Sequence, residues 1–436
     1  MDRHATSESP RAFLTALFRR AVEVADPMRV VPPHLPDRPK GRFLVIGAGK
    51  ASARMAEAVE AELGPCEGLV ITRYGHARPT RGIEIVEAGH PVPDAAGAQA
   101  TRRMLDLVAG LGPEDLALAL ISGGGSALLC APAEGLTLDD KIAINAALLA
   151  SGAPIGEINV VRKHLSRVKG GRLAAACHPA RLLTLLISDV PGDDPAGIAS
   201  GPTVGETSTP TDALAILKHY RIAPPDAAPL AATTLGAVMN VLRGPSDVVV
   251  PGDPRLATAE TRIIAAPSQS LAAAADMARA AGVAVRMLGD AIEGEARALG
   301  AAQARLALSL RAEVAASARP LLLLSGGECT VTRRGNGIGG PNAEFALAAA
   351  MALNGAPGIH VLACDTDGVD GAAEIAGAYA GPECLTLALA KGRDPAKALA
   401  QNDAHSFFGA IGGQVVTGPT LTNVNDFRAL LIQPEG

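Results

Sequence analysis

The sequence of 436 residues contains no tryptophan, and its aromatic side chains are limited to three tyrosines and seven phenylalanines. Aliphatic side chains must therefore fill the interior, and hydrophobic residues make up 48% of the chain. Cores built from alanine, valine, leucine and isoleucine are typical of layered α/β proteins. The chain is too long for one ordinary core, so two domains are expected.

Basic clusters and long apolar runs are also missing. The net charge is −5, and no block of Lys and Arg interleaved with aromatics occurs. This composition argues against nucleic acid or an anionic membrane as partners. No stretch approaches 18 uninterrupted apolar residues, and no basic-then-apolar signal segment is present. We therefore expect a soluble, cytoplasmic protein, either a monomer or a homodimer.

The cysteines and histidines lack the spacings of metal or redox motifs. None of the six cysteines forms a CxxC pair, so reduced thiols buried in a core are expected. The nine histidines show no HExxH or similar spacing, which leaves a zinc site without support.

Short apolar segments alternate with loops and Ala/Leu-rich helices along most of the chain. Apolar strands that alternate with helices predict parallel sheets covered on both faces. A change in composition between Leu242 and Pro254 predicts a domain boundary. We expect an α/β protein of two domains, residues 1–245 and 255–436, each a mostly parallel sheet flanked by helices, the first Rossmann-like. The predicted strands are Phe43–Ile46, Leu69–Thr72, Ile83–Glu87, Leu116–Ile121, Leu182–Ile187, Arg262–Ala266, Val283–Leu288, Leu321–Leu324 and Ile359–Ala363.

A run of three glycines follows one predicted strand, in the order Ser122, Gly123, Gly124, Gly125, Ser126. Consecutive glycines allow a tight turn whose N–H groups point at one spot, as suits the phosphates of a nucleotide. A strand-to-helix turn without a ligand is the plainer interpretation, but a single glycine would be enough for such a turn.

Gly47-Ala48-Gly49-Lys50 follows an earlier strand and matches neither standard nucleotide motif. A P-loop requires Ser or Thr where Ala51 stands, and a dinucleotide fingerprint requires Gly or Ala where Ser52 stands. What remains is a lysine at the start of a helix, where a cation opposes the helix dipole unless it meets an anion. The alternative is a solvated surface lysine.

Charged residues gather in three further segments. The densest basic stretch, Val161–Arg172, contains Arg162 and Lys169; it could bind a phosphate or carboxylate, or form a solvated helix face. Two acidic loops follow strands, and their carboxylates could bind Mg²⁺ or accept a hydroxyl proton, although an Asp in such a loop more often caps a turn. These loops contain Asp189, Asp193 and Asp194, and Asp365, Asp367 and Asp370.

Taken together, these segments resemble the class II glycerate 2-kinase family, whose C-terminal part is the MOFRL domain and whose members are sometimes named hydroxypyruvate reductases. The resemblance rests on the order and spacing of motifs along nearly the whole chain. They are Gly47–Ala51, Gly89–Asp94, Ser122–Leu128, Asn159–Leu173, Ser188–Pro195, Gly201–Thr203, Gly326–Val331, Asp365–Gly371 and Thr422–Asp426.

The resemblance implies an ATP- and Mg²⁺-dependent kinase that converts D-glycerate to 2-phosphoglycerate in a cleft between its domains. The essential lysine of the family matches Lys50, and its functional aspartate matches Asp367. Many members have an active-site arginine where this chain has Pro341. Proline suits a first helical position but cannot bind phosphate, so either Arg162, Arg333 or Arg334 replaces that arginine, or substrate affinity differs from that of the relatives.

The predicted site therefore combines Lys50, Asp367 and Asp189 as catalytic groups. Lys50, Arg162 and Glu328 would bind the substrate, and Asp189 or Asp193 would hold the metal. The nucleotide's phosphates would lie on Lys169 and on Ser122, Gly123, Gly124, Gly125 and Ser126. Two alternatives remain: an NADPH-dependent hydroxypyruvate reductase, which the missing third glycine disfavours, and a non-catalytic nucleotide or phosphosugar sensor.

Overall fold

The computed structural model describes residues 9–222, 231–371 and 373–434. The chain divides into two compact units. The first-sheet unit consists of Pro27–Ser188 and Asp193–Ile264, and the second-sheet unit of the residues up to Asp26, Asp189–Gly192 and the residues from Ala265 onward. The predicted division into 1–245 and 255–436 differs from this at three places: the N-terminal helix and Asp189–Gly192 belong to the second-sheet unit, and residues 255–264 belong to the first.

The first-sheet unit holds a six-stranded sheet in the order β3-β2-β1-β4-β5-β6. The pairs β1–β2, β1–β4, β2–β3 and β4–β5 are all parallel. This is the strand order of a doubly wound Rossmann fold, which confirms the expected Rossmann-like class. The strands are β1 (Phe43–Ala48), β2 (Glu67–Arg73), β3 (Ile83–Ala88), β4 (Leu116–Ser122), β5 (Arg181–Ile187) and β6 (Ala259–Ala265).

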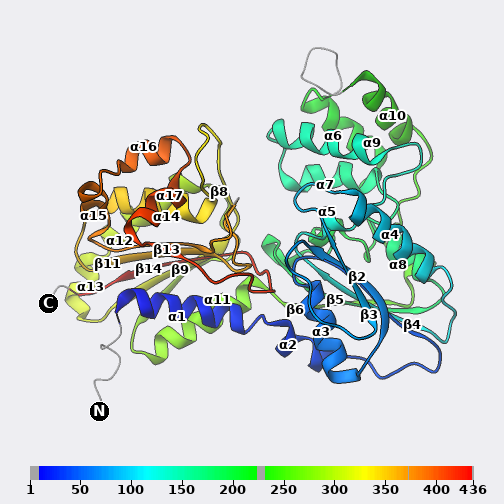
Figure 1. Cartoon of the computed structure of the whole chain (residues 1–436), viewed down its shortest axis with the longest axis horizontal. Helices are drawn as coiled ribbons and strands as arrows, with labels where there is room; N and C mark the ends of the chain where they lie inside the picture. The colour runs from blue at the N-terminus through cyan, green and yellow to red at the C-terminus, as the bar shows by residue number, and fades with distance from the viewer. Residues whose placement is uncertain (1–8, 223–230, 372, 435–436) are drawn as a thin grey trace. The chain divides into compact units, whose positions relative to one another are not determined.

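Every residue of β1 and β4 is buried, because helices cover both faces of this sheet (Figure 1). Four further helices, α6, α7, α9 and α10, pack around a hydrophobic cluster of their own (Figure 1). Thr137 and Thr209 begin α6 and α9 with capping boxes. The helices of the unit are α2 (Pro27–Val30), α3 (Ser52–Leu63), α4 (Ala95–Val108), α5 (Gly125–Leu128), α6 (Leu138–Ala150), α7 (Ile155–His164), α8 (Arg172–Cys177), α9 (Pro210–His219) and α10 (Ala232–Arg243), with short 3₁₀ turns at Pro32–His34, Ile198–Ser200 and Pro254–Leu256. A further 3₁₀ turn, Pro191–Asp193, begins in the second-sheet unit and ends in this one.

The second-sheet unit holds a six-stranded sheet in the order β13-β12-β11-β14-β9-β7. Within this sheet β7 and β9 pair in parallel, and the other four pairs are antiparallel. The prediction of a mostly parallel second sheet was therefore wrong, because β12 and β14 were not recognised as strands. The strands of the unit are β7 (Ala284–Gly289), β9 (Leu321–Gly327), β11 (Ile359–Asp365), β12 (Gly377–Ala380), β13 (Gln414–Val415) and β14 (Asp426–Ile432), with β8 (Gly294–Glu295) and β10 (Cys329–Thr330) forming a small separate pair.

Helices cover both faces of the second sheet as well. Helices α1 and α11 pack on one face, and α12 and α14 on the other (Figure 1). Alternate residues of β9 supply the two cores: Leu322 and Leu324 face α1 and α11, whereas Leu321 and Leu323 face the other layer. The helices are α1 (Pro10–Glu23), α11 (Pro267–Ala280), α12 (Ala296–Ser309), α13 (Arg311–Ser317), α14 (Pro341–Leu353), α15 (Cys384–Ala390), α16 (Pro395–Ala400) and α17 (Ala404–Ile411).

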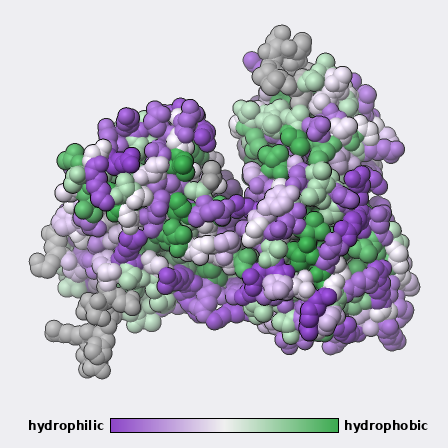
Figure 2. Space-filling view, viewed as in Figure 1, coloured by the Kyte–Doolittle hydropathy of each residue, from purple (hydrophilic) through white to green (hydrophobic). Residues whose placement is uncertain are grey.

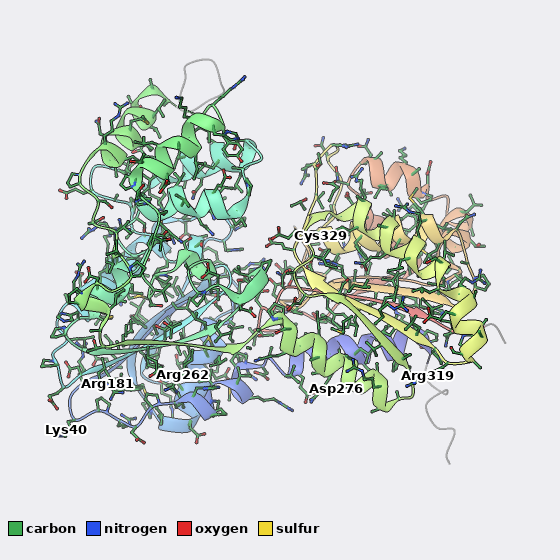
Figure 3. The ribbon with its side chains drawn as sticks, turned by 180° about the vertical axis from the view of Figure 1, so that it is seen from behind. Lys40, Arg181, Arg262, Asp276, Arg319 and Cys329 are labelled. Carbon is green, nitrogen blue, oxygen red and sulfur yellow. The ribbon has the colours of Figure 1, made fainter. Side chains whose placement is uncertain are left out.

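The state of the cysteines and the polarity of the surface match what the amino-acid composition predicts. All six cysteines are free and buried, as expected, and one of them, Cys329, lies in β10 (Figure 3). The exposed Arg181 lies on β5, beside the edge strand β6 that carries Arg262 (Figure 3). On the face shown in Figure 2, hydrophilic side chains are interspersed with hydrophobic ones over each unit. Among the described residues, every helix is too short or too polar to cross a bilayer.

Candidate functional site

Two loops meet at the point of the first sheet where the strand order reverses. Strands β1 and β4 are neighbours, and the chain leaves their carboxyl ends at Gly49-Lys50 and at Gly123. The amide of Lys50 donates to the carbonyl of Gly123 at 2.8 Å, and the amide of Ala51 donates to Ser122 Oγ at 3.0 Å. Open α/β sheets bind ligands at this switch point, so the structure brings Lys50 and the triple-glycine turn to the expected place.

The close approach of the two loops requires glycine at position 124. Gly124 has φ +81°, and a Cβ added there would lie 3.0 Å from Lys50 Cγ and 3.1 Å from His90 Cδ2. The backbone of Gly124 thus lies against the lysine stem and the imidazole ring. His90, on the loop after β3, is a neighbour of the turn that sequence reasoning did not single out.

The turn presents three amide groups that have no acceptor. Within the described residues, the N–H groups of Gly124, Gly125 and Ser126 make no hydrogen bond. Helix α5 is only four residues long, so its dipole adds little, and the amides themselves supply the positive potential. Consecutive unsatisfied amides at a strand end form a concave site for an anion such as a phosphate.

Two buried cations, Lys141 and Lys169, and the partly buried Arg162 lie close behind this turn. Lys169 Nζ donates to the carbonyls of Ser126 and Leu129 at 2.9 and 3.0 Å. Burial lowers the pKa of Lys169 well below its ordinary value, and the charge of Lys141 lowers it further. Burial also lowers the pKa of Lys141 to about 8, and lowers the pKa of Arg162.

None of these three cations has a carboxylate within ion-pair distance in the described part of the chain. Lys141 donates to the carbonyl of Leu165, and Arg162 donates to the side-chain carbonyls of Asn145 and Asn159. Carbonyl dipoles compensate buried positive charge only in part, so the region attracts an anion.

The segment Ala199–Ser200 has a strained backbone and contacts the same turn. Ala199 and Ser200 have φ angles of +52° and +61°, which non-glycine residues rarely adopt. Ser200 is fully buried, and its Oγ lies 2.7 Å from Ser126 Oγ and 3.1 Å from Asn159 Oδ1. Strain of about 1–3 kcal/mol per residue persists where surrounding contacts hold it, often at functional sites. Sequence reasoning missed Ser200 and Asn159 as site residues; only the motifs Asn159–Leu173 and Gly201–Thr203 pointed to this region.

Two predicted phosphate ligands face inward. Ser122 Oγ is buried and accepts from the amide of Ala51, so it joins the two loops. Lys169 is fully buried and holds the carbonyl end of α5. Arg162, in contrast, is only partly buried in this unit, and its amide partners leave its charge uncompensated.

The second sheet also gathers polar residues at one edge. Strands β9 and β11 end, and β14 begins, at this edge, since Gly327 and Asp365 both pair with Asp426. Glu328 follows β9 and is exposed. Asp367 is fully buried, and one of its carboxylate oxygens accepts from the amide of Val369 at 2.8 Å.

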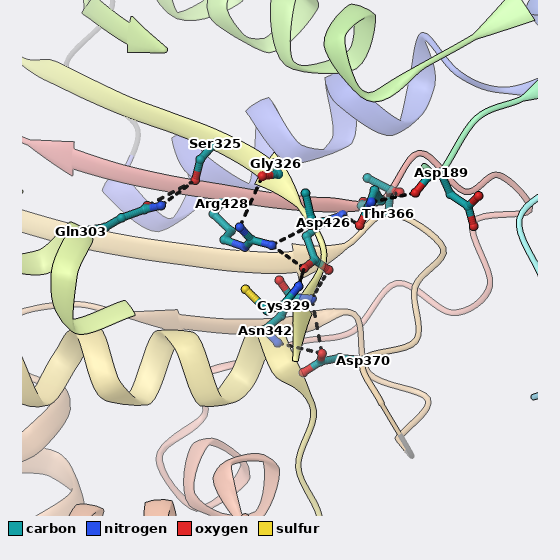
Figure 4. Close-up of polar contacts among 12 residues, drawn as sticks. Asp189, Gln303, Ser325, Gly326, Cys329, Asn342, Thr366, Asp370, Asp426 and Arg428 are labelled. Carbon is teal, nitrogen blue, oxygen red and sulfur yellow. Dashed lines mark hydrogen bonds and ion pairs between the residues drawn. The ribbon is translucent and has the colours of Figure 1, made fainter. Parts of the chain in front are cut away.

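A buried network ties this edge to the start of α14 (Figure 4). The carboxylate of Asp370 accepts from the amides of Asn342 and Ala343 at 2.9 and 2.8 Å, so it caps the helix. Asn342 Nδ2 and Arg428 Nη2 each donate to Asp426 at 2.6 Å. Burial raises the pKa of Asp426, and Arg428 opposes that shift.

Pro341 opens α14 at the first helical position, as expected. The alternatives for the missing arginine, Arg333 and Arg334, lie exposed between β10 and α14. Neither is placed on a predicted phosphate loop of its own unit, so Arg162 is the alternative that lies beside an anion-binding turn.

The predicted metal ligands belong to different units. Asp189 Oδ2 accepts from Asn423 Nδ2 at 2.9 Å. Asp193 Oδ1 is buried and has no hydrogen-bond donor within the described residues. A buried carboxylate oxygen without a donor fits a hard cation such as Mg²⁺. No group of three or more His, Cys, Asp or Glu side chains in the described ranges is arranged around a common metal position, so both ligands stay predictions.

Known proteins resemble the chain along nearly all of its length. A family described as a domain of unknown function, DUF4147, matches residues 13–232, and the MOFRL family matches residues 321–426. A D-glycerate 2-kinase from Thermotoga maritima is 38% identical over 98% of this chain and 99% of its own. An Agrobacterium vitis protein, named provisionally as a hydroxypyruvate reductase, is 50% identical over 97% of this chain and 95% of its own. The crystal structure of glycerate kinase from Thermotoga maritima matches with a TM-score of 0.82 at 37% identity, covering 97% of this chain and 99% of that one.

Proposed function

The chain belongs to the glycerate 2-kinase family, and from this membership we infer that it phosphorylates D-glycerate with ATP to give 2-phosphoglycerate. The observation that carries the inference is the anion site at the first-sheet switch point. Three amides without acceptors lie on one turn, and Lys169 donates to a carbonyl of that turn. Lys141 and Arg162, which also lack carboxylate partners among the described residues, lie near enough to Lys169 for their charges to lower its pKa. Such a site suits a triphosphate and an acidic substrate.

Phosphoryl transfer requires mainly positioning and charge neutralisation, because its transition state is loose. The amides of Gly124, Gly125 and Ser126 would hold phosphate oxygens of ATP. Lys50 would neutralise charge on the transferring group, and Arg162 would bind the carboxylate of glycerate. Mg²⁺ bound at Asp189 or Asp193 would supply further neutralisation of the phosphates.

In the proposed step, the 2-hydroxyl oxygen of glycerate forms a bond to the γ-phosphorus as the bond from phosphorus to the β,γ-bridging oxygen breaks. ADP leaves, and the hydroxyl proton passes to a base. We keep Asp367 as that base, because it is a buried carboxylate on the loop that matches the family motif. Glu328 stays a predicted substrate contact. The free thiols fit a reducing compartment, so we propose that the enzyme works in the cytoplasm.

The reductase alternative rests on the Gly47–Lys50 loop and Arg73 and on the names of two Agrobacterium vitis relatives, but the loop departs from the dinucleotide fingerprint. Ser52, in α3, occupies the third position of the dinucleotide fingerprint. Two assays separate the reactions: ADP release from ATP and D-glycerate, and NADPH oxidation with hydroxypyruvate. We expect the first alone; NADPH oxidation without ADP release would reverse the assignment. Phosphorus NMR of the product then distinguishes 2- from 3-phosphoglycerate.

A further inference from the structure

We infer that the Ser126 hydroxyl presents only lone pairs to its ligand, and that it therefore recognises the 2-hydroxyl of glycerate instead of a phosphate oxygen. This inference rests on the proposed kinase function. It gives the hydroxyl of Ser126 a role in binding the substrate, whereas the sequence analysis placed Ser126 among the phosphate ligands.

The direction of the proton chain follows from Arg162. Arg162 Nη1 donates to Asn159 Oδ1 at 3.4 Å. A guanidinium cannot accept a hydrogen bond, so the carbonyl oxygen of Asn159 must face it. The other amide orientation would set an NH₂ group against the guanidinium.

The orientation of the Asn159 amide determines where the hydroxyl protons of Ser200 and Ser126 point. Ser200 Oγ lies 3.1 Å from Asn159 Oδ1 and donates its single proton there. Ser126 Oγ lies 2.7 Å from Ser200 Oγ. Since the proton of Ser200 is committed, Ser126 must be the donor in that contact. Ser126 is partly exposed, and its remaining hydrogen-bonding capacity is two lone pairs.

An oxygen that can only accept excludes the oxygens of a fully ionised phosphate. A divalent cation is disfavoured as well, because Lys169 Nζ lies 2.9 Å from the carbonyl oxygen of the same serine. The partner that fits is a neutral hydroxyl donor beside the phosphate-binding amides, which describes the hydroxyl of the acceptor substrate. The contact would turn that proton away from the γ-phosphorus and a lone pair toward it.

Ser126 cannot be the base of the reaction. A proton taken up by Ser126 would have to move through Ser200 to Asn159, and neither the amide nor Arg162 accepts a proton near neutral pH. Ser126 therefore orients the hydroxyl, and Ser200, Asn159 and Arg162 act as positioning residues that hold its proton away from the ligand.

The test compares two monohydroxy acids by calorimetry on the full chain. D-Lactate keeps the 2-hydroxyl of glycerate, whereas 3-hydroxypropanoate keeps only the 3-hydroxyl. We expect Ser126→Ala to weaken D-lactate about tenfold, which corresponds to one hydrogen bond. Binding of 3-hydroxypropanoate and of ATP should stay within about twofold of wild type. Ser126→Thr, which keeps the hydroxyl, should restore D-lactate binding.

Ser246→Ala, at an exposed position of the same unit, serves as the matched control and should leave all three affinities unchanged. In the Ser200→Ala background, Ser126→Ala should cost less than it does in wild type, because the proton of Ser126 is no longer held. Equal losses for the two acids, or a loss confined to ATP with or without Mg²⁺, would overturn the inference. A wild-type chain without ADP release would instead refute the proposed function, and the contrast between the acids would still decide the role of Ser126.

Discussion

The loops at the strand ends of the two sheets differ in how far their polar groups are satisfied. At the first-sheet edge, amides of the triple-glycine turn lack acceptors, and Lys141, Arg162 and Lys169 lack carboxylate partners among the described residues. At the second-sheet edge, charged groups meet one another: Asp426 pairs with Arg428, and Asp370 caps α14. Unsatisfied groups favour a ligand, whereas satisfied groups favour a rigid scaffold. The first edge is therefore built to bind, and the buried network of the second edge holds in place the loops that carry the proposed Asp367 and Glu328.

Removing one member of the buried pair should have the largest effect on stability. Arg428→Met leaves Asp426 without its countercharge, and breaking a buried pair costs about 3–5 kcal/mol. Denaturant unfolding should show this loss. Arg279→Met in the same unit removes an exposed pair with Asp276 and should cost under about 1 kcal/mol. A similar small loss for both variants would contradict the scaffold role of the second edge.

Truncating the lysine of the first edge should affect turnover instead of folding. Lys50→Ala removes a cation from the transferring group and should lower kcat by about 10²–10³-fold, as for loss of one group that stabilises transition-state charge. Circular dichroism should show an intact fold. Lys40→Ala, at an exposed position of the same unit, is the control. A Lys50→Ala enzyme with more than half of wild-type activity would remove this residue from the mechanism.

A pair of glycine variants separates backbone strain from the blocking of the site. Gly124 and Gly135 have nearly equal φ angles, +81° and +84°, but an added Cβ meets Lys50 and His90 only at position 124. Both Gly→Ala variants should lose about 1–2 kcal/mol of stability. Only Gly124→Ala should also lose activity, by about tenfold or more for a displaced site. Equal activities of the two folded variants would show that the turn is not part of the site.

The last expected effect is a pH dependence of stability, which changes only gradually with each pH unit. Burial lowers the pKa of Lys141 from 10.5 to about 8, so the unfolded chain binds more protons between these values. Wild-type stability should therefore rise with pH in that window, by at most about 1.4 kcal/mol per pH unit. Lys141→Met lacks this titration, so its stability advantage at pH 7 should shrink toward pH 10. Parallel curves for the two proteins would contradict the buried charge.

Local patterns predicted the central strands β1 and β4 well, because these strands are almost entirely apolar and each is followed by a distinct loop. Strand β6, which carries Glu260 and Arg262, was assigned to the second domain instead of the first sheet. The antiparallel pairing of the second sheet was not predicted, because two of its strands were not recognised. Strand β14 contains the buried Arg428, and β12 consists mainly of small residues. The links among Ser126, Asn159 and Ser200 join residues up to 74 positions apart. No local pattern encodes such contacts. Local patterns also could not show that Ser122 and Lys169 point inward. Their polarity suggested that they bind a ligand, but Ser122 accepts from the amide of Ala51 and Lys169 donates to the carbonyl of Ser126.

Hydrogen exchange on the full chain tests the binding role of the first edge most directly. The amides of Gly124, Gly125 and Ser126 have no acceptor in the described structure, so they should exchange rapidly in the free protein. ATP should slow deuterium uptake in the peptide that carries residues 123–129. Protection of other peptides with unchanged uptake in this one would show that the triphosphate binds elsewhere.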